Sequence, residues 1–185
     1  MTRACLLALV VLAAAPSFAA QPDADASAPA VAAKSFYDVY MTLHPSDGIP
    51  DPATRAKFEP LVSPTLDHLF VEGERAEDRY ATATKHQSPP LIEGDLFTPN
   101  FEGATAFRIG ACETDAHGGH CAVTLSYDDR KDKPIVWTDT VNLVRTAAGW
   151  RVDDIVYGGN GDFGNKGRLT AVLEDAIRNG DNFSK

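Results

Sequence analysis

The spacing of apolar residues changes from helical to strand-like near the middle of the chain, and this change limits the fold more than any other feature. In the first part, apolar side chains recur three or four positions apart, as on one face of a helix. After Lys85 a stretch rich in Pro and Gly runs to Pro99, and apolar and polar residues then alternate with period two. Such alternation is typical of strands with one buried face. The order of these patterns predicts helices first and an antiparallel sheet second, in one α+β domain.

Three helices are predicted before this change. The first covers about residues 29–43, and the Pro-rich segment 45–50 ends it. The next two share one start signal, a residue that caps a helix followed by Pro in the first turn. Asp51 begins the second helix, and Ser63 begins the third, which ends near Thr84. The residues expected to face the core are Phe36, Val39, Tyr40, Leu43, Phe58, Leu66, Leu69, Phe70, Gly73, Ala76 and Tyr80.

Four strands are predicted in the second half, at residues 104–112, 120–127, 134–145 and 150–157. In the third strand Asp139 falls among the apolar residues of one face, which are Ile135, Trp137, Val141 and Leu143. In the fourth strand the alternation changes phase at Asp153-Asp154, which predicts a β-bulge. A closing helix, with Gly180 just beyond it, is marked by Leu169, Val172, Leu173, Ala176 and Ile177. We therefore expect helices packed on one face of a curved four-stranded antiparallel sheet, followed by a C-terminal helix.

Cys112 and Cys121 flank a polar turn between the first two predicted strands. In an oxidising compartment an even pair of cysteines indicates a disulfide. Such a bond closes a short hairpin and, by restricting the unfolded chain, stabilises the fold by about 2.5–3 kcal/mol. The alternative is a metal site that also uses His117 and His120. Because neither a C-x-x-C pair nor a zinc-binding spacing is present, we expect the disulfide and no metal.

The first 19 residues predict a secretory signal peptide. Arg3 precedes an unbroken apolar run at residues 6–15, and residues 17–19 end it with a small-residue cleavage pattern. The run is shorter than the roughly 18 apolar residues of a transmembrane helix. We expect export to the periplasm, a mobile leader at residues 20–30 and a single domain at residues 31–185.

Loss of that segment makes the chain more acidic. One of the 17 Lys and Arg residues is removed and none of the 26 Asp and Glu residues, so the net charge changes from -9 to -10. This charge disfavours nucleic acid and anionic lipid surfaces as partners. It favours a basic protein of the cell envelope or a cationic ligand.

Three short segments resemble those of a known family. They are Phe36-Tyr37 with Tyr40, Gly94-Asp95-Leu96-Phe97, and the run from Trp150 to Tyr157. Together they resemble the bacterial family catalogued as domain of unknown function 3828, over about residues 30–179. The resemblance implies a cone-shaped fold similar to that of nuclear transport factor 2, and export, and it assigns no catalytic residue. Distant relatives of that fold include steroid isomerase-like enzymes, which use an Asp base and a Tyr hydrogen-bond donor in the cavity.

The acids of the third and fourth strands are the candidates for such a base. Asp139 among apolar residues, or Asp153 or Asp154 beside the bulge, would have its pKa raised by burial. Tyr127 or Tyr157 would donate the hydrogen bond. The alternative for the Asp153-Asp154 pair is a structural role or exposure to water. The candidate contacts for a ligand or partner are Trp137, Asp153, Asp154 and Tyr157.

No motif in the chain is specific for catalysis. The Gly-rich stretch at residues 158–167 lacks the G-K-[ST] ending of a phosphate loop and the ligand pattern of a calcium loop, so we expect a surface loop there. We predict an exported, non-catalytic binding protein without cofactor or metal. Its specific form is an immunity-type inhibitor whose acidic surface blocks a basic toxin or cell-wall hydrolase. The alternative is a small-molecule binder or isomerase-like enzyme that uses an Asp in the cavity.

Overall fold

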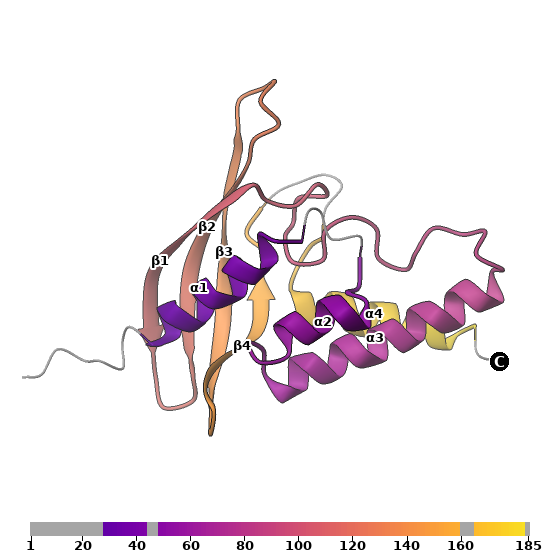
Figure 1. The fold of residues 1–185 in the computed structure, drawn as a ribbon, viewed down its shortest axis with the longest axis horizontal. Coiled ribbons are helices and arrows are strands. Elements are labelled where there is room, and N and C mark those ends of the chain that lie inside the picture. The colour runs from indigo at the N-terminus through magenta and orange to yellow at the C-terminus, as the bar shows by residue number, and fades with distance from the viewer. Residues whose placement is uncertain (1–27, 44–47, 160–164, 184–185) are drawn as a thin grey trace, which may run out of the picture.

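One antiparallel sheet and four helices make up the fold (Figure 1). The structure, a computed structural model, describes residues 28–43, 48–159 and 165–183. The elements in these residues are α1 (Ala28–Tyr40), α2 (Pro52–Phe58), α3 (Pro64–Ala83), β1 (Ala106–Thr114), β2 (Gly119–Tyr127), β3 (Ile135–Thr146), β4 (Gly149–Val156) and α4 (Leu169–Asp181). The strands pair in the order β1-β2-β3-β4, and the sheet does not close into a barrel. The predicted α+β class with a C-terminal helix is confirmed.

The first helix begins and ends earlier than expected. It starts at Ala28, so the last residues assigned to the leader are helical, and Pro29 is buried. It ends at Tyr40, before the predicted end at Leu43. The predicted signal peptide, the rest of the leader and the middle of the Gly-rich loop lie outside the described residues. Within the described part of the chain, no helix is long and apolar enough to cross a membrane.

The start signals of α2 and α3 act as expected. The Asp51 carboxylate accepts hydrogen bonds from the N–H groups of Ala53 (2.8 Å) and Thr54 (3.1 Å). The Ser63 hydroxyl accepts one from the N–H of Leu66 at 3.0 Å. Each cap satisfies N–H groups that the first turn of a helix leaves without a partner, which stabilises a helix by about 1 kcal/mol.

A β-bulge interrupts the pairing of β3 with β4. Asn142 pairs with Asp154, and the next pair along the strands is Leu143 with Val152. Asp153 is therefore the extra residue. The bulge confirms the change of phase predicted at this point, and it lets side chains on both sides of it reach the core.

The core is centred on aromatic rings between the helices and the sheet. The Phe97 ring lies 4.9 Å from the ring of Phe58 on α2 and 5.5 Å from that of Phe36 on α1. It also lies 6.0 Å from the ring of Phe70 on α3. The helix α1 contacts all four strands, so it covers one face of the sheet (Figure 1).

The close contact of α3 with α4 depends on a glycine. Gly180 lies inside the last turn of α4 and not beyond the helix, as we had expected. A Cβ atom built on it would lie 2.7 Å from the carbonyl oxygen of Ala76 on α3. No side chain fits at that distance, so only glycine allows the two backbones to approach this closely.

The β2–β3 hairpin extends past the rest of the sheet (Figure 1). β1 first pairs at Ala106, opposite Ser126, so the tip of the hairpin lies beyond that edge strand. Ile135, which we expected on the buried face, is 54% exposed, and Val136 is 61% exposed. The expectation for Ile135 was wrong because alternation identifies a face of a strand but not how far the helices cover it.

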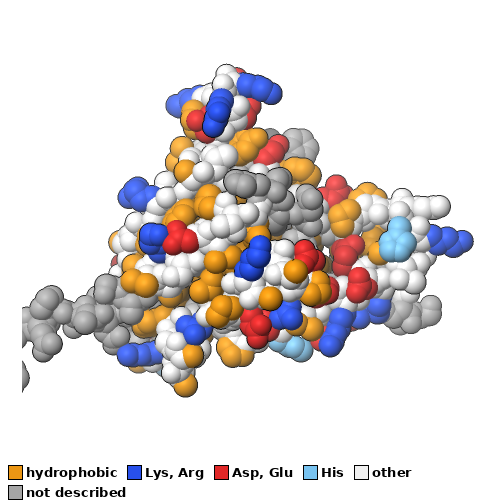
Figure 2. Space-filling model, viewed as in Figure 1, with side chains coloured by type: hydrophobic (Ala, Val, Ile, Leu, Met, Phe, Trp, Pro, Cys, Tyr) orange, Lys and Arg blue, Asp and Glu red, His pale blue; other side chains and the backbone are white. Residues whose placement is uncertain are grey.

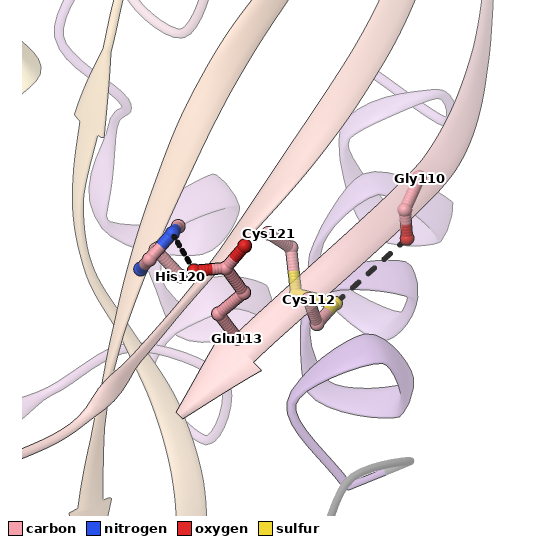
Figure 3. The surroundings of a disulfide bond; sticks show 5 residues. All are labelled: Gly110, Cys112, Glu113, His120 and Cys121. Atoms are coloured by element: carbon pink, nitrogen blue, oxygen red, sulfur yellow. Dashed lines mark hydrogen bonds and ion pairs between the residues drawn. A yellow bond between two sulfur atoms is a disulfide. The ribbon is translucent and has the colours of Figure 1, made fainter. Parts of the chain in front are cut away.

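The predicted disulfide is present between β1 and β2 (Figure 3). Cys112 and Cys121 are paired directly across the two strands, with their Cα atoms 4.1 Å apart. The register of β1 shifts between Ile109 and Cys112, a second irregularity that the sequence did not predict. Cys121 is fully buried, so the bond fastens the edge strand to the core.

We predict that Cys112→Ser with Cys121→Ser lowers the free energy of unfolding by about 2.5–3 kcal/mol, because the unfolded chain regains the freedom of the closed loop. Urea denaturation of the double variant measures this loss. The wild-type protein in strong reductant is the control and is expected to lose the same amount. A double variant as stable as the oxidised protein would contradict the prediction.

Candidate functional site

Two carboxyls and three tyrosines are buried between α1 and the sheet. We call them the inner polar cluster: Tyr37, Tyr40, Asp95, Asp139 and Tyr157. None is more than 8% exposed. Tyr37 and Tyr40 come from α1, Asp95 from the loop before β1, Asp139 from β3, and Tyr157 follows β4. Burial raises the pKa of Tyr37, and the other four groups raise it further, so all of them lie within electrostatic range of it.

Asp139 is the one predicted base that the structure places in this cluster. Its side chain is fully buried. One carboxylate oxygen accepts a hydrogen bond from the N–H of Gly158 at 2.8 Å, and the other accepts one from the indole of Trp137 at 3.2 Å. Burial raises the pKa of Asp139 to about 6, although both hydrogen bonds act to lower it. The carboxyl thus holds the start of the Gly-rich loop against β3.

Asp95 was not predicted as a site residue and entered only as part of the family resemblance. It is 2% exposed. Its carboxylate accepts hydrogen bonds from the N–H of Phe97 at 2.7 Å and from the hydroxyl of Tyr40 at 2.9 Å. Burial raises its pKa to about 6. The sequence could indicate only a common turn, in which an Asp side chain accepts a hydrogen bond from the backbone two residues later. The burial of Asp95 depends on Tyr40, which lies 55 positions away in the chain.

The tyrosines differ in whether their hydroxyls have partners. Tyr157 donates to the carbonyl oxygen of Leu96 at 2.6 Å. Tyr40 donates to Asp95 and accepts the N–H of Ala104 at 2.8 Å. The hydroxyl of Tyr37 is buried and has no hydrogen-bond partner among the described residues. An unsatisfied buried hydroxyl costs about 1–3 kcal/mol, and Tyr37 has the one tyrosine hydroxyl of the cluster without a hydrogen-bond partner among the described residues.

Asp154, the second predicted base, has a structural role instead. Its carboxylate accepts hydrogen bonds from the N–H of Thr170 (3.0 Å) and of Ile155 (2.9 Å). It also pairs with Arg168, whose Nε lies 2.8 Å away. Arg168 occupies the cap position of α4, but its side chain makes no capping hydrogen bond. Because Thr170 is in the first turn of α4, the Asp154 carboxylate caps the helix instead.

The other predicted contacts are divided between the interior and the edge of the sheet. Trp137 and Tyr157 are buried, at 7% and 8% exposure, and both belong to the interior around Asp139. Tyr127 is half-buried at the end of β2 and is not among the groups that perturb the cluster. Asp153 is half-buried in the bulge. The structure therefore brings together Asp139, Trp137 and Tyr157 but not the other candidates.

The cluster can bind a proton and one further hydrogen-bond acceptor. A carboxyl with a pKa near 6 has the strength of a general base at neutral pH. Each carboxylate oxygen of Asp95 and Asp139, however, already accepts a hydrogen bond from the chain itself. Only the Tyr37 hydroxyl remains to donate to an added group.

The histidines of the β1–β2 turn do not form a metal site with the cysteines. Both sulfur atoms are used by the disulfide, and His120 faces Glu113 with 3.6 Å between its Nε2 and the carboxylate oxygen (Figure 3). His117 and His120 line an open pocket of about 310 Å³. In the described part of the chain no three His, Cys, Asp or Glu side chains are arranged to hold a metal ion.

The acidity of the protein is concentrated on two helices. α3 carries five acidic side chains and two arginines, and α4 carries three and one. We call this pair the acidic helix layer, and Figure 2 shows acidic side chains gathered over α3 on the right of the view. All three arginines are already paired within the layer, as Arg75–Glu72, Arg79–Asp181 and Arg178–Asp175. Among the described residues, four acids of the layer form no ion pair. Glu77 accepts a hydrogen bond from the N–H of Leu91 at 2.8 Å, and the other three are Glu74, Asp78 and Glu174.

We predict that Asp154→Asn lowers the free energy of unfolding by about 1–3 kcal/mol, because α4 loses its cap and Arg168 its partner. Thermal denaturation measures the loss. The matched control is Asp153→Asn, which removes the same charge from the neighbouring residue and is expected to change stability by less than about 0.5 kcal/mol. Equal effects of the two substitutions would contradict the assigned role.

Comparison with protein families, with curated proteins and with solved structures finds no match to this chain. The resemblance stated from the three short segments remains a prediction.

Proposed function

We propose that the protein is an exported, non-catalytic binding protein of the cell envelope that presents the acidic helix layer to a basic partner. The observation that carries this proposal is the excess of acids over arginines on α3 and α4. Each arginine of the layer is neutralised by an acid of the same layer. The remaining charge is therefore available to a partner, and complementary charge speeds the encounter of two proteins.

Export is supported by the disulfide. Cross-linked cysteines persist in oxidising compartments and are rare in the cytosol. Together with the N-terminal apolar run, this favours the periplasm as the place of action. The specific partner we propose is a basic toxin or cell-wall hydrolase that the protein inhibits, as an immunity protein does. The proposed kinship with the domain of unknown function 3828 family agrees with export.

A non-catalytic role is supported by the use to which the buried acids are put. Asp95, Asp139 and Asp154 accept hydrogen bonds from main-chain N–H groups and from side chains of the same protein. These bonds hold two loops and α4 in place. These hydrogen bonds within the protein account for the burial of the carboxyls, so no substrate is needed to explain it.

One observation favours a second candidate function, a small-molecule site between α1 and the sheet. The Tyr37 hydroxyl is buried without a partner, beside the Asp139 carboxyl that raises its pKa. Rings of Phe107, Phe36 and Tyr40 surround it at centroid distances of 5.3–5.9 Å. A neutral guest with a hydrogen-bond acceptor satisfies the hydroxyl, and an isomerase-like enzyme would act on such a guest with Asp139 as base.

The main proposal predicts that a basic partner binds the acidic helix layer. The test is capture from an envelope extract of the host by wild-type protein and by the triple variant Glu74→Gln, Asp78→Asn, Glu174→Gln. Removing three surface charges is expected to weaken binding roughly tenfold, at about 0.5 kcal/mol per charge. Capture is also expected to fall as salt rises.

The matched control removes three exposed acids elsewhere, with Glu93→Gln, Glu102→Gln and Asp132→Asn. It changes the net charge equally and leaves the layer intact. Equal loss in both triple variants, or capture that does not respond to salt, would contradict the assignment of this surface.

The second candidate predicts that Tyr37→Phe lowers the thermal midpoint by about 2–4 °C. The bound small molecule loses the hydrogen bond from the Tyr37 hydroxyl, which stabilises the folded protein by about 1 kcal/mol. Tyr157→Phe, which loses the bond to Leu96, is the control for the loss of one buried hydrogen bond. Mass spectrometry of the extracted native protein identifies the guest. A Tyr37→Phe variant that is as stable as the wild type, or more so, would exclude an occupied site.

A further inference from the structure

Two buried carboxyls hold two loops that lie at the same end of the sheet. Asp95 anchors the loop before β1 through the N–H of Phe97, and the carbonyl of Asp95 accepts a hydrogen bond from the Asn165 amide at 2.7 Å. Asp139 anchors the chain after β4 through the N–H of Gly158. Figure 1 shows both loops beside the base of the β2–β3 hairpin.

The loops pack closely against Asp95 and against the strand that carries Asp139. A Cβ atom on Gly103 would lie 2.8 Å from both the Asp95 carboxylate and the Tyr40 hydroxyl. One on Gly158 would lie 1.8 Å from the carbonyl oxygen of Thr138. The glycines let the backbone lie directly on the acids and the strand, so the carboxyls are enclosed by the loops that they hold.

In the described part of the chain, the groups that donate hydrogen bonds to the two carboxyls are neutral. Asp95 is faced by Tyr40 of α1, by Thr98 of its own loop and by Tyr157 beyond β4. Asp139 is faced by Trp137 of its own strand and, from α1, by Tyr37. Among the described residues, no Lys, Arg or His forms an ion pair with either acid.

A buried charge without a counter-ion is costly, and such a group tends to take up a proton instead. Asp154 shows the contrast within the same protein, since Arg168 is its counter-ion. We propose that Asp95 and Asp139 form a proton-operated latch, which holds the two loops to the core when the carboxyls are neutral and loosens them when both are charged.

The direction of the pH dependence follows from burial. The pKa of each acid is raised from 3.8 to about 6 in the folded protein. Protonation therefore favours the folded state: the contribution is fully present below about pH 4 and is lost as pH rises through about 6. A difference of about two pKa units corresponds to a change of roughly a hundredfold per carboxyl in the folding equilibrium constant. In an exported protein, the latch reports the acidity outside the cytoplasm.

The experiment compares wild type, Asp95→Asn, Asp139→Asn and the double variant by urea denaturation between pH 4.5 and pH 8. We expect the wild-type midpoint to fall as pH rises, each single variant to lose part of that slope, and the double variant to lose most of it. Asp153→Asn is the control and is expected to keep the full slope. A wild-type midpoint that stays constant or rises with pH would overturn the latch, as would a double variant with the wild-type slope.

A second measurement uses the wild-type protein and so does not depend on the variants folding. Hydrogen exchange, corrected for the intrinsic effect of pH, reports on the amides of Phe97 and Gly158. Their protection is expected to fall above pH 6, while that of Ser63, which bonds the carbonyl of Val152 at 2.8 Å, is expected to stay constant. Carboxyl ¹³C shifts are expected to show both acids titrating near pH 6. Ordinary titration near pH 4, or equal protection at all pH values, would contradict the proposal.

Discussion

The packing of Phe97 decides how the helices meet the sheet. Its ring contacts one aromatic ring from each of the helices α1, α2 and α3. No single strand of the sheet contacts all three of these helices. Such aromatic pairs contribute about 0.5–1.5 kcal/mol each beyond the area they bury. The backbone of Phe97 is positioned by the Asp95 carboxylate, two residues earlier. The polar and apolar parts of the core therefore depend on each other, since the ring can enter only if the acid is buried with it.

Features that depend on neighbours in the chain could be predicted from the sequence. The caps Asp51 and Ser63 act on N–H groups two or three positions away, so the signal is complete within one turn. The bulge at Asp153 changes the phase of its own strand, which alternation records directly. The disulfide followed from the turn between Cys112 and Cys121 together with the expected compartment. In each case the interacting residues and the sequence pattern that indicates them lie within about ten residues of each other.

Features that depend on distant partners could not be predicted in the same way. Asp139 and Asp154 looked alike as acids in strands, yet one lies in a neutral interior and the other caps a helix through Thr170. The difference lies in which segment the fold brings to each carboxyl. Asp95 was missed for the same reason, because its partner Tyr40 is remote in the chain. The exposure of Ile135 depends on where the covering helix ends, which the alternation of its own strand does not record.

The disulfide encloses a short segment of chain, since its cysteines lie nine positions apart. A loop of this size closes readily, at a small cost in chain entropy, before distant segments have met. β1 is one of the two edge strands of the sheet, and unpaired edges are where partly folded chains join one another. With β1 tied to β2, the inner side of that edge stays occupied even when the helices have moved away. The bond therefore also protects the molecule against aggregation during the time when its core is open.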